Sequence, residues 1–256
     1  MKIAHLLDMD GVLVRGGVPI EGSVDFVGAL VEDKRTFQVF TNNSKYTPED
    51  HAFRLRRMGF PVEPHHIYTS ALATARFVST QIPGASAYVI GDQGLTSALQ
   101  AVGCRTTAFS PDYVVLGDAT SYHYEEIAAG ARLISAGARF IATNSDPTAP
   151  AETGLHPACG AVAAVITSAT GMQPYFIGKP NSFMTRCVLE KLGVGAEQTV
   201  LVGDRMDTDV LAGLESGMRS VLVLTGVTAS ADLSRFPFKP DLIVDRLADL
   251  AGHIWV

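Results

Sequence analysis

The sequence predicts an α/β protein in which a doubly wound parallel sheet carries an inserted second domain. Two observations predict this class: short apolar runs alternate with helical segments along the chain, and the runs lack the polar alternation of half-exposed strands. Apolar strands separated by helices indicate a parallel sheet that helices cover on both faces. The expected strands are Ile3–Leu7, Thr36–Phe40, Ser86–Ile90, Tyr113–Leu116, Arg139–Ala142, Tyr175–Ile177, Thr199–Val202 and Ser220–Leu224.

Capping residues mark the ends of two of the intervening helices. Residues 47–50, Thr-Pro-Glu-Asp, start one helix with a capping hydroxyl, a proline in the first turn and acids facing the helix dipole, and Gly59 ends it. Residues 181–182, Asn-Ser, start another helix, which ends at Gly193. Residues 146–157 are rich in Pro, Ala, Thr and Gly, and we expect them to form a loop.

The composition excludes several classes of protein. The chain has 26 acidic and 20 basic residues, a net charge of −6, and no Lys/Arg run, which argues against binding a nucleic-acid polymer. No apolar stretch approaches the roughly 18–20 residues of a membrane span, and charge follows the amino terminus too soon for a signal peptide. Three distant cysteines are typical of reduced, buried thiols. We therefore expect a cytoplasmic protein without membrane contact.

Two carboxylates, Asp8 and Asp10, stand directly after the first expected strand. Side chains two positions apart share one face of an extended chain, and at 4 Å their repulsion is roughly 4 kcal/mol at an effective dielectric near 20. A cation or a proton must offset it. Ligands of open α/β sheets bind outside the carboxyl ends of the strands, where both acids would stand. The alternative is a tight Asp10-Gly11 turn that Asp8 caps.

Polar residues also follow two later strands. Thr41, Asn42 and Asn43 offer hydroxyl, amide and backbone N–H donors that suit a phosphate, although they could equally form a polar turn and helix cap. Lys179 is held extended by Pro180, which directs its ammonium group as a point charge toward phosphate oxygens. The alternative for Lys179 is a solvated surface position.

A second group of acids follows the seventh expected strand, Thr199–Val202. Asp204 would join Asp8 and Asp10 at one edge of the sheet, and such an oxygen-rich cluster is the ligand type that Mg²⁺ prefers. Asp207 and Asp209 come next, and they could simply be first-turn acids on a helix dipole.

The ordered motifs D-x-D-G, T-N-N, G-K-P and G-D-x-x-x-x-D, each after a strand, resemble the haloacid-dehalogenase (HAD) superfamily of phosphatases over nearly all of the chain. Residues 140–144 (Phe-Ile-Ala-Thr-Asn), 157–160 (Pro-Ala-Cys-Gly) and 176–180 (Phe-Ile-Gly-Lys-Pro) are similar to its NagD-like, type IIA branch. The resemblance implies a Rossmann-like core with a type-II α/β cap. It also implies a Mg²⁺-dependent phosphomonoesterase for small phosphorylated substrates, notably nucleoside monophosphates such as UMP, and p-nitrophenyl phosphate in vitro.

The resemblance further implies roles for individual residues. Asp8 matches the nucleophile that becomes an aspartyl phosphate, and Asp10 matches the acid/base that protonates the leaving group and then activates water. Thr41 matches the hydroxyl that holds the phosphoryl group, and Lys179 matches the cation beside the nucleophile.

The implied metal ligands are the Asp8 side chain, the Asp10 main-chain carbonyl and Asp204, with Asp209 supporting them. Asn42 and Asn43 would be further phosphate donors.

The spacing of the motifs locates an insertion. Thr41 and Lys179 are 138 positions apart, whereas a compact crossover needs about 30 residues. We therefore expect a cap domain over residues 80–175 in a core made of residues 1–79 and 176–256. Asn144 and Asp146 lie where a cap would contact the leaving group, or else in a solvated loop. Related proteins pair through their caps, so a homodimer is an open expectation.

Two alternative functions are also compatible with the sequence. The same family includes phosphatases of sugar phosphates, glycerol phosphate and phosphoglycolate. A receiver-like signalling module also uses acids, a Thr and a Lys on a parallel sheet. The chain is about twice too long for such a module, and Asp10 would speed hydrolysis of its phosphoryl group.

Overall fold

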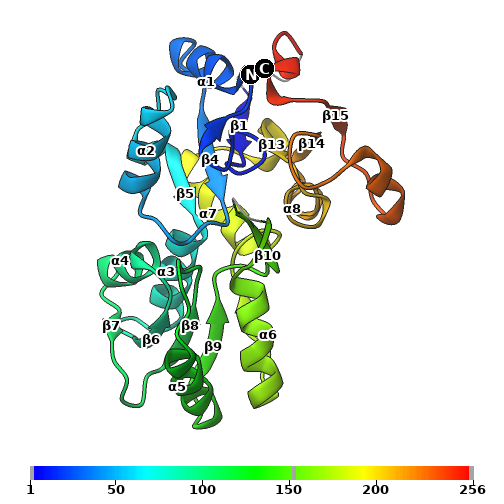
Figure 1. The fold of residues 1–256 in the computed structure, drawn as a ribbon. Coiled ribbons are helices and arrows are strands. Elements are labelled where there is room, and N and C mark those ends of the chain that lie inside the picture. The colour runs from blue at the N-terminus through cyan, green and yellow to red at the C-terminus, as the bar shows by residue number, and fades with distance from the viewer. Residues whose placement is uncertain (1–2, 152–153, 254–256) are drawn as a thin grey trace. The chain divides into compact units, whose positions relative to one another are not determined.

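The computed structural model describes residues 3–151 and 154–253, and it confirms the predicted α/β class (Figure 1). All eight predicted strands are present, with their ends within one residue of the predicted ends. The chain divides into two compact units, one of residues 1–41, 49–68 and 179–256 and one of residues 42–48 and 69–178. The predicted insert, 80–175, falls inside the second unit.

The first unit is built on a six-stranded sheet in the order β15-β14-β13-β1-β4-β5. β1 pairs in parallel with β13 and β4, so that Leu7 lies between Val202 and Val39. β14 and β15 continue the sheet in parallel beside β13. The strands are β1 (Ala4–Leu7), β4 (Phe37–Thr41), β5 (Ile67–Thr69), β13 (Thr199–Gly203), β14 (Arg219–Val223) and β15 (Leu242–Val244).

Helices and short helical turns surround this sheet. Asn181 caps α7, since its side chain accepts a 2.8 Å hydrogen bond from the Phe183 N–H, and Gly193 ends the helix in a left-handed conformation with φ 66°, as the sequence predicts. The helices are α1 (Ser23–Glu32), α2 (Pro48–Arg57), α7 (Ser182–Leu192) and α8 (Leu211–Ser216), with turns η1 (Pro64–His66), η2 (Ala196–Gln198), η3 (Met206–Val210), η4 (Ser230–Arg235) and η5 (Leu247–Leu250).

The second unit has its own parallel sheet, in the order β12-β9-β8-β6-β7. Helices α5 and α6 pack on each other and against this sheet, and α3 packs on α4 (Figure 1). A separate core forms around Ile90, Leu116, Ile134 and Ile166. The elements are β6 (Ser86–Ile90), β7 (Arg105–Thr106), β8 (Tyr113–Leu116), β9 (Arg139–Ala142), β12 (Tyr175–Phe176), α3 (Ser70–Gln81), α4 (Gln93–Ala101), α5 (Tyr124–Ser135) and α6 (Cys159–Thr170).

Residues 146–157, expected to be a loop, instead contain a β-ribbon. β10 (Thr148–Ala151) pairs antiparallel with β11 (Gly154–Pro157), with Thr148 opposite Pro157. The prediction was wrong because Pro and Gly indicate a turn locally, yet a two-stranded ribbon consists of edge strands, which tolerate proline. A second small ribbon, β2 (Val14–Arg15) with β3 (Val18–Pro19), is too short to give a sequence pattern.

The three cysteines are free and buried, as their spacing predicts. Among the described residues, no helix combines the length and the apolar character that crossing a bilayer requires.

Candidate active site

Two parallel strands bring acids from distant parts of the chain to one edge of the first sheet. Leu7 pairs with Val202, so Asp8 and Asp204 follow adjacent strands at their carboxyl ends. The Asp8 N–H donates to the Val202 carbonyl at 2.9 Å, which extends the pairing up to the acid. Asp209 completes a buried group in which one carboxylate oxygen from each acid lies within 4.8 Å of the others.

Lys179 lies among these acids. Its Nζ donates to Asp8 Oδ1 at 2.7 Å, to Asp209 Oδ1 at 2.7 Å and to the Phe40 carbonyl at 2.9 Å. All three donor positions of the ammonium group are therefore used. The residue is only 2% exposed, so these are buried, charge-assisted bonds that fix the Asp8 carboxylate in one orientation.

Asp209 is positioned by the short turn η3 that follows β13. Its Oδ2 accepts the Arg205 N–H at 3.1 Å and its Oδ1 accepts from Lys179. Gly203 allows this approach, since a side chain there would overlap the Asp209 carboxylate. The adjacent Asp207 instead forms an exposed ion pair with Arg205 at 2.8 Å.

The site holds three buried carboxylates and one buried ammonium group, and this environment shifts the pKa values of Asp8, Asp204 and Lys179. Burial raises the pKa of Asp8 well above its usual range; Lys179 opposes the shift, whereas Asp209 and Asp204 add to it. Burial, with Asp209, raises the pKa of Asp204 to about 7. Burial lowers the pKa of Lys179, but Asp209 and Asp8 outweigh it, so its pKa is raised. The ionised cluster thus has an excess of negative charge.

Asp204 shows how the cluster fits a divalent cation. Its Oδ2 accepts the Val227 N–H at 2.7 Å, but its Oδ1 is buried with no hydrogen-bond partner among the residues that the structure describes. Gly11 and Gly226 enclose this carboxylate so closely that a side chain at either position would overlap it. A buried oxygen without a partner, beside two further carboxylates, suits a hard cation such as Mg²⁺.

Two further predicted residues lie in the first unit. Thr41 is the last residue of β4 and is buried. Asp10 is half-buried and its backbone forms an isolated bridge with Val14. The Asp10-Gly11 turn that the sequence offered as an alternative is present, with Gly11 at φ 86°. Asp8 nevertheless contacts Lys179.

The remaining predicted residues belong to the second unit, which the chain enters at Asn42. Asn42 Nδ2 donates to Asp146 Oδ2 at 3.2 Å, and Asn144 Nδ2 donates to the Asn42 carbonyl at 3.0 Å. Asn43 accepts the Lys45 N–H at 3.1 Å with its side-chain oxygen. Three of the four predicted substrate-binding residues are therefore brought together within this unit.

Asp118 is a member of this network that sequence reasoning missed. Its Oδ2 accepts from Asn144 Nδ2 at 2.9 Å and from the Ser44 hydroxyl at 3.0 Å, and its own N–H donates to that hydroxyl at 2.8 Å. The signal that could have found it is its position two residues after the expected strand Tyr113–Leu116, just as Asp204 stands two residues after Thr199–Val202. In the first unit, Gly11 and Gly226 were missed as parts of the acid site.

Comparisons with known proteins agree with the motif order. Residues 5–105 match the family model of haloacid dehalogenase-like hydrolases, and residues 176–250 match a HAD-hydrolase-like model. A dihydroxyacetone phosphatase of Corynebacterium glutamicum is 47% identical over 98% of this chain and 91% of its own length. The solved structure of NagD from Escherichia coli K-12 has a TM-score of 0.90 at 36% identity, covering 97% of this chain and 98% of that one. A glycerol phosphate phosphatase of Mycobacterium tuberculosis, solved in complex with magnesium, has a TM-score of 0.91 at 32% identity, covering 98% of this chain and 79% of that one.

Proposed function

The chain belongs to the haloacid dehalogenase-like hydrolases as a NagD-like phosphatase, and from this premise we propose that it is a Mg²⁺-dependent phosphomonoesterase acting through Asp8. The observation that carries the proposal is the buried cluster in which Lys179 bonds to Asp8 and Asp209, while one oxygen of Asp204 has no partner in the described part of the chain. A phosphate ester is the substrate class that needs a fixed carboxylate and concentrated positive charge at the same place.

In the proposed reaction, an Asp8 carboxylate oxygen attacks phosphorus and forms an O–P bond while the ester O–P bond breaks. Asp10 donates a proton to the departing alkoxide. Asp10 then removes a proton from a water molecule, which attacks phosphorus and releases inorganic phosphate, so that the Asp8 carboxylate is regenerated. Lys179 orients Asp8 and reduces its repulsion of the phosphate, and Thr41 donates its hydroxyl to a phosphoryl oxygen.

Asp8, Asp204 and the Asp10 carbonyl would hold the metal ion, with Asp209 supporting them. When bound, Mg²⁺ supplies positive charge that offsets the repulsion between the carboxylates and the phosphate dianion. The need for it follows from the charge count of the cluster, since one lysine cannot neutralise three buried carboxylates.

Hydrolysis of p-nitrophenyl phosphate, with and without EDTA, tests the proposal. We expect EDTA to abolish turnover, and Asp8→Asn to reduce it at least about a thousandfold because the amide cannot act as the nucleophile. Asp207→Asn is the matched control, since Asp207 is exposed and pairs only with Arg205 among the described residues. Turnover that survives EDTA or Asp8→Asn would refute the mechanism, and an aspartyl phosphate stable for hours would favour a receiver-like module.

The proposed substrates are small phosphorylated metabolites, with nucleoside monophosphates such as UMP as the first candidates. The name of the 47% identical relative favours a second candidate, a three-carbon ester such as dihydroxyacetone phosphate. Comparing kcat/KM for these two, glycerol phosphate, phosphoglycolate and a hexose phosphate separates the candidates. The substrate roles of Asn42, Asn43, Asn144 and Asp146, and pairing of two chains through the insert, stay predictions.

A further inference from the structure

The loop that follows β14, residues 224–228, holds Asp204 at two points. The Val227 N–H donates to Asp204 Oδ2 at 2.7 Å, and the Thr228 N–H donates to the Asp204 carbonyl at 3.1 Å. β14 lies beside β13 in the sheet, so its loop reaches the residue that directly follows β13. The same short loop therefore fixes both the main chain and the carboxylate of Asp204.

This loop also holds the Asp10-Gly11 turn of the D-x-D-G motif. The Thr225 hydroxyl donates to the Gly11 carbonyl at 2.6 Å, although the two residues are 214 positions apart in the chain. Gly11 lies against Asp204 as well, since a side chain at Gly11 would overlap the Asp204 carboxylate and come within 3.0 Å of the Gly226 Cα. Thr225 thus ties the turn to the loop that holds Asp204.

The direction of the Asp10 carbonyl depends on how this turn is held. The Asp10 carbonyl and the Gly11 N–H belong to one planar peptide unit, so the 2.8 Å bond from the Gly11 N–H to the Val14 carbonyl also fixes where the Asp10 carbonyl points. The Thr225 hydroxyl fixes the carbonyl on the other side of Gly11. Both peptide units of Gly11 are therefore anchored, one within the turn and the other by Thr225.

The two segments that this loop joins would supply two of the metal ligands. In the proposed function, the Asp10 carbonyl and the Asp204 carboxylate share one Mg²⁺ ion, and Mg²⁺ requires near-ideal octahedral geometry at about 2.0–2.1 Å. A change in the separation of these two groups should therefore weaken binding. Partners that orient metal ligands typically contribute about 10–100-fold to metal affinity.

We propose that Thr225 is a positioning residue for the Mg²⁺ site. Its hydroxyl ties the Asp10-Gly11 turn to the loop that holds Asp204, and it thereby sets the separation of the Asp10 carbonyl and the Asp204 carboxylate. The inference rests on the proposed function, because it uses the metal ligands named there. The effect of Thr225 is indirect, since its hydroxyl donates to the Gly11 carbonyl and acts through the backbone.

The test measures Mg²⁺ binding to the full chain by isothermal titration calorimetry, without substrate. Thr225→Val replaces the hydroxyl with a methyl group and should raise the dissociation constant for Mg²⁺ about tenfold or more. Thr225→Ser keeps the hydroxyl and should bind Mg²⁺ nearly as tightly as the wild type. A serine variant that binds Mg²⁺ as weakly as the valine variant would show that the hydroxyl is not the cause, and would overturn the proposal.

Thr199→Val is the matched control. The Thr199 hydroxyl also donates to a glycine carbonyl, that of Gly195 at 2.9 Å, but Thr199 is the first residue of β13, whereas Asp204 follows the last. Each valine variant loses one hydroxyl–carbonyl bond, so the melting temperature in EDTA should fall by about 2–4 °C in both. Mg²⁺ binding should weaken in Thr225→Val alone, and equal weakening in both variants would overturn the proposal.

The wild-type protein separates failure of this inference from failure of the proposed function. If the wild type binds Mg²⁺ and hydrolyses p-nitrophenyl phosphate, while Thr225→Val binds Mg²⁺ equally well, the metal site stands and the role of Thr225 is refuted. If the wild type binds no Mg²⁺, the proposed metal dependence is refuted, and the role of Thr225 is refuted with it.

Discussion

Replacing Lys179 with methionine should strongly destabilise the protein in metal-free buffer, because it leaves buried carboxylates without their cation. The ammonium group makes bonds of 2.7 Å to both Asp8 and Asp209 and is 2% exposed. Two charge-assisted bonds at about 2 kcal/mol each, or one broken buried ion pair at about 3–5 kcal/mol, both predict a loss of about 4 kcal/mol. For a chain of this size the melting temperature should fall by about 8–16 °C.

The stability that Lys179→Met loses should also depend on pH, in a direction set by the pKa of Asp8. Its pKa is raised by burial even with Lys179 present, and removing the lysine raises it further. The unfolded pKa of such a carboxyl group is about 3.9. When its pKa in the folded protein is higher, the free energy of unfolding falls as the pH rises through the folded-state pKa. The difference between Lys179→Met and the wild type should therefore be larger at pH 8 than at pH 5.

The assay is urea unfolding followed by circular dichroism in EDTA at both pH values. Lys191→Met is the matched control from the same unit, because Lys191 is exposed and forms no ion pair among the described residues; its ammonium group donates to the His65 carbonyl at 2.7 Å and lies 5.7 Å from the ring centre of Tyr68. We expect the control to lose less than about 1 kcal/mol. The reasoning is refuted if both variants lose the same amount, or if the loss in Lys179→Met is the same at pH 5 and pH 8.

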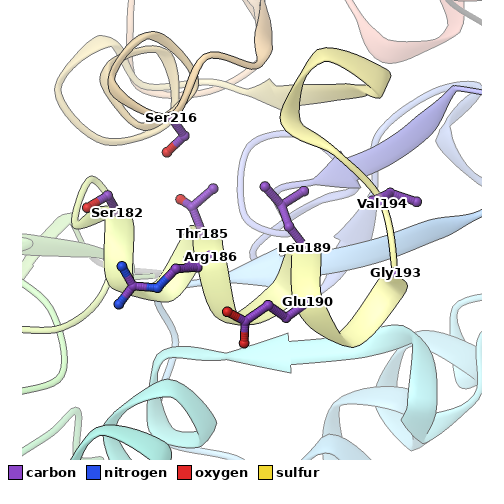
Figure 2. A pocket seen from close by; sticks show the side chains of 8 residues that line it. All are labelled: Ser182, Thr185, Arg186, Leu189, Glu190, Gly193, Val194 and Ser216. Carbon is purple, nitrogen blue, oxygen red and sulfur yellow. The ribbon is translucent and has the colours of Figure 1, made fainter.

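Three further predictions concern other parts of the chain. Gly226→Ala should raise the Mg²⁺ concentration for half-maximal phosphatase activity by about tenfold or more, because the new methyl group overlaps the Asp204 carboxylate; unchanged activation would contradict the metal assignment. Burial and the nearby His65 lower the pKa of His66 to about 4. As the pH falls, the His66 side chain is therefore protonated in the unfolded chain before it is protonated in the folded protein. The free energy of unfolding should drop by about 1 kcal/mol between about pH 6.5 and 4, after allowance for solvent screening. Urea unfolding at several pH values in that range should show that the free energy of unfolding of His66→Gln depends less steeply on pH than that of the wild type. An unchanged dependence on pH would contradict this prediction. Thr185→Val should leave the melting temperature unchanged or raise it, since the Thr185 hydroxyl, on α7 (Figure 2), is buried and has no partner among the described residues. Thr74→Val should instead cost about 1 kcal/mol, because it loses the 2.8 Å hydrogen bond from the Thr74 hydroxyl to the Ser70 carbonyl. Equal losses in thermal unfolding would show that the Thr185 hydroxyl is bonded.

Most of the strands that the sequence predicted are buried along most of their length, although Tyr175–Phe176 is not. Strands such as Ala4–Leu7 and Tyr113–Leu116 are buried throughout, so their apolar character does not depend on which face is considered. β15 (Leu242–Val244) was not predicted, since it is a three-residue edge strand with partly exposed side chains. The ribbon of β10 and β11 was missed because its hydrogen bonds come from pairing, which local composition does not encode.

The sequence likewise predicted only some features of the candidate active site. Asp8, Asp204 and Lys179 could be singled out because each is a charged residue within two positions of the end of an apolar strand. The contact of Asp209 with Lys179 could not, because a helix-opening acid looks the same in sequence whether it faces solvent, as Asp207 does, or a buried lysine. The hydrogen bonds of Asn144 to the Asn42 carbonyl and to Asp118 likewise join positions far apart in the chain.

The sequence by itself determined the class of fold, the order of the motifs and the family, because burial on both faces of a strand and charge at its end are local properties. Only the tertiary structure decided which acids share Lys179 and which glycines enclose Asp204. The physical reason is that electrostatic and hydrogen-bond energies fall away within a few ångströms. Their outcome therefore depends on distances between residues that lie far apart along the chain.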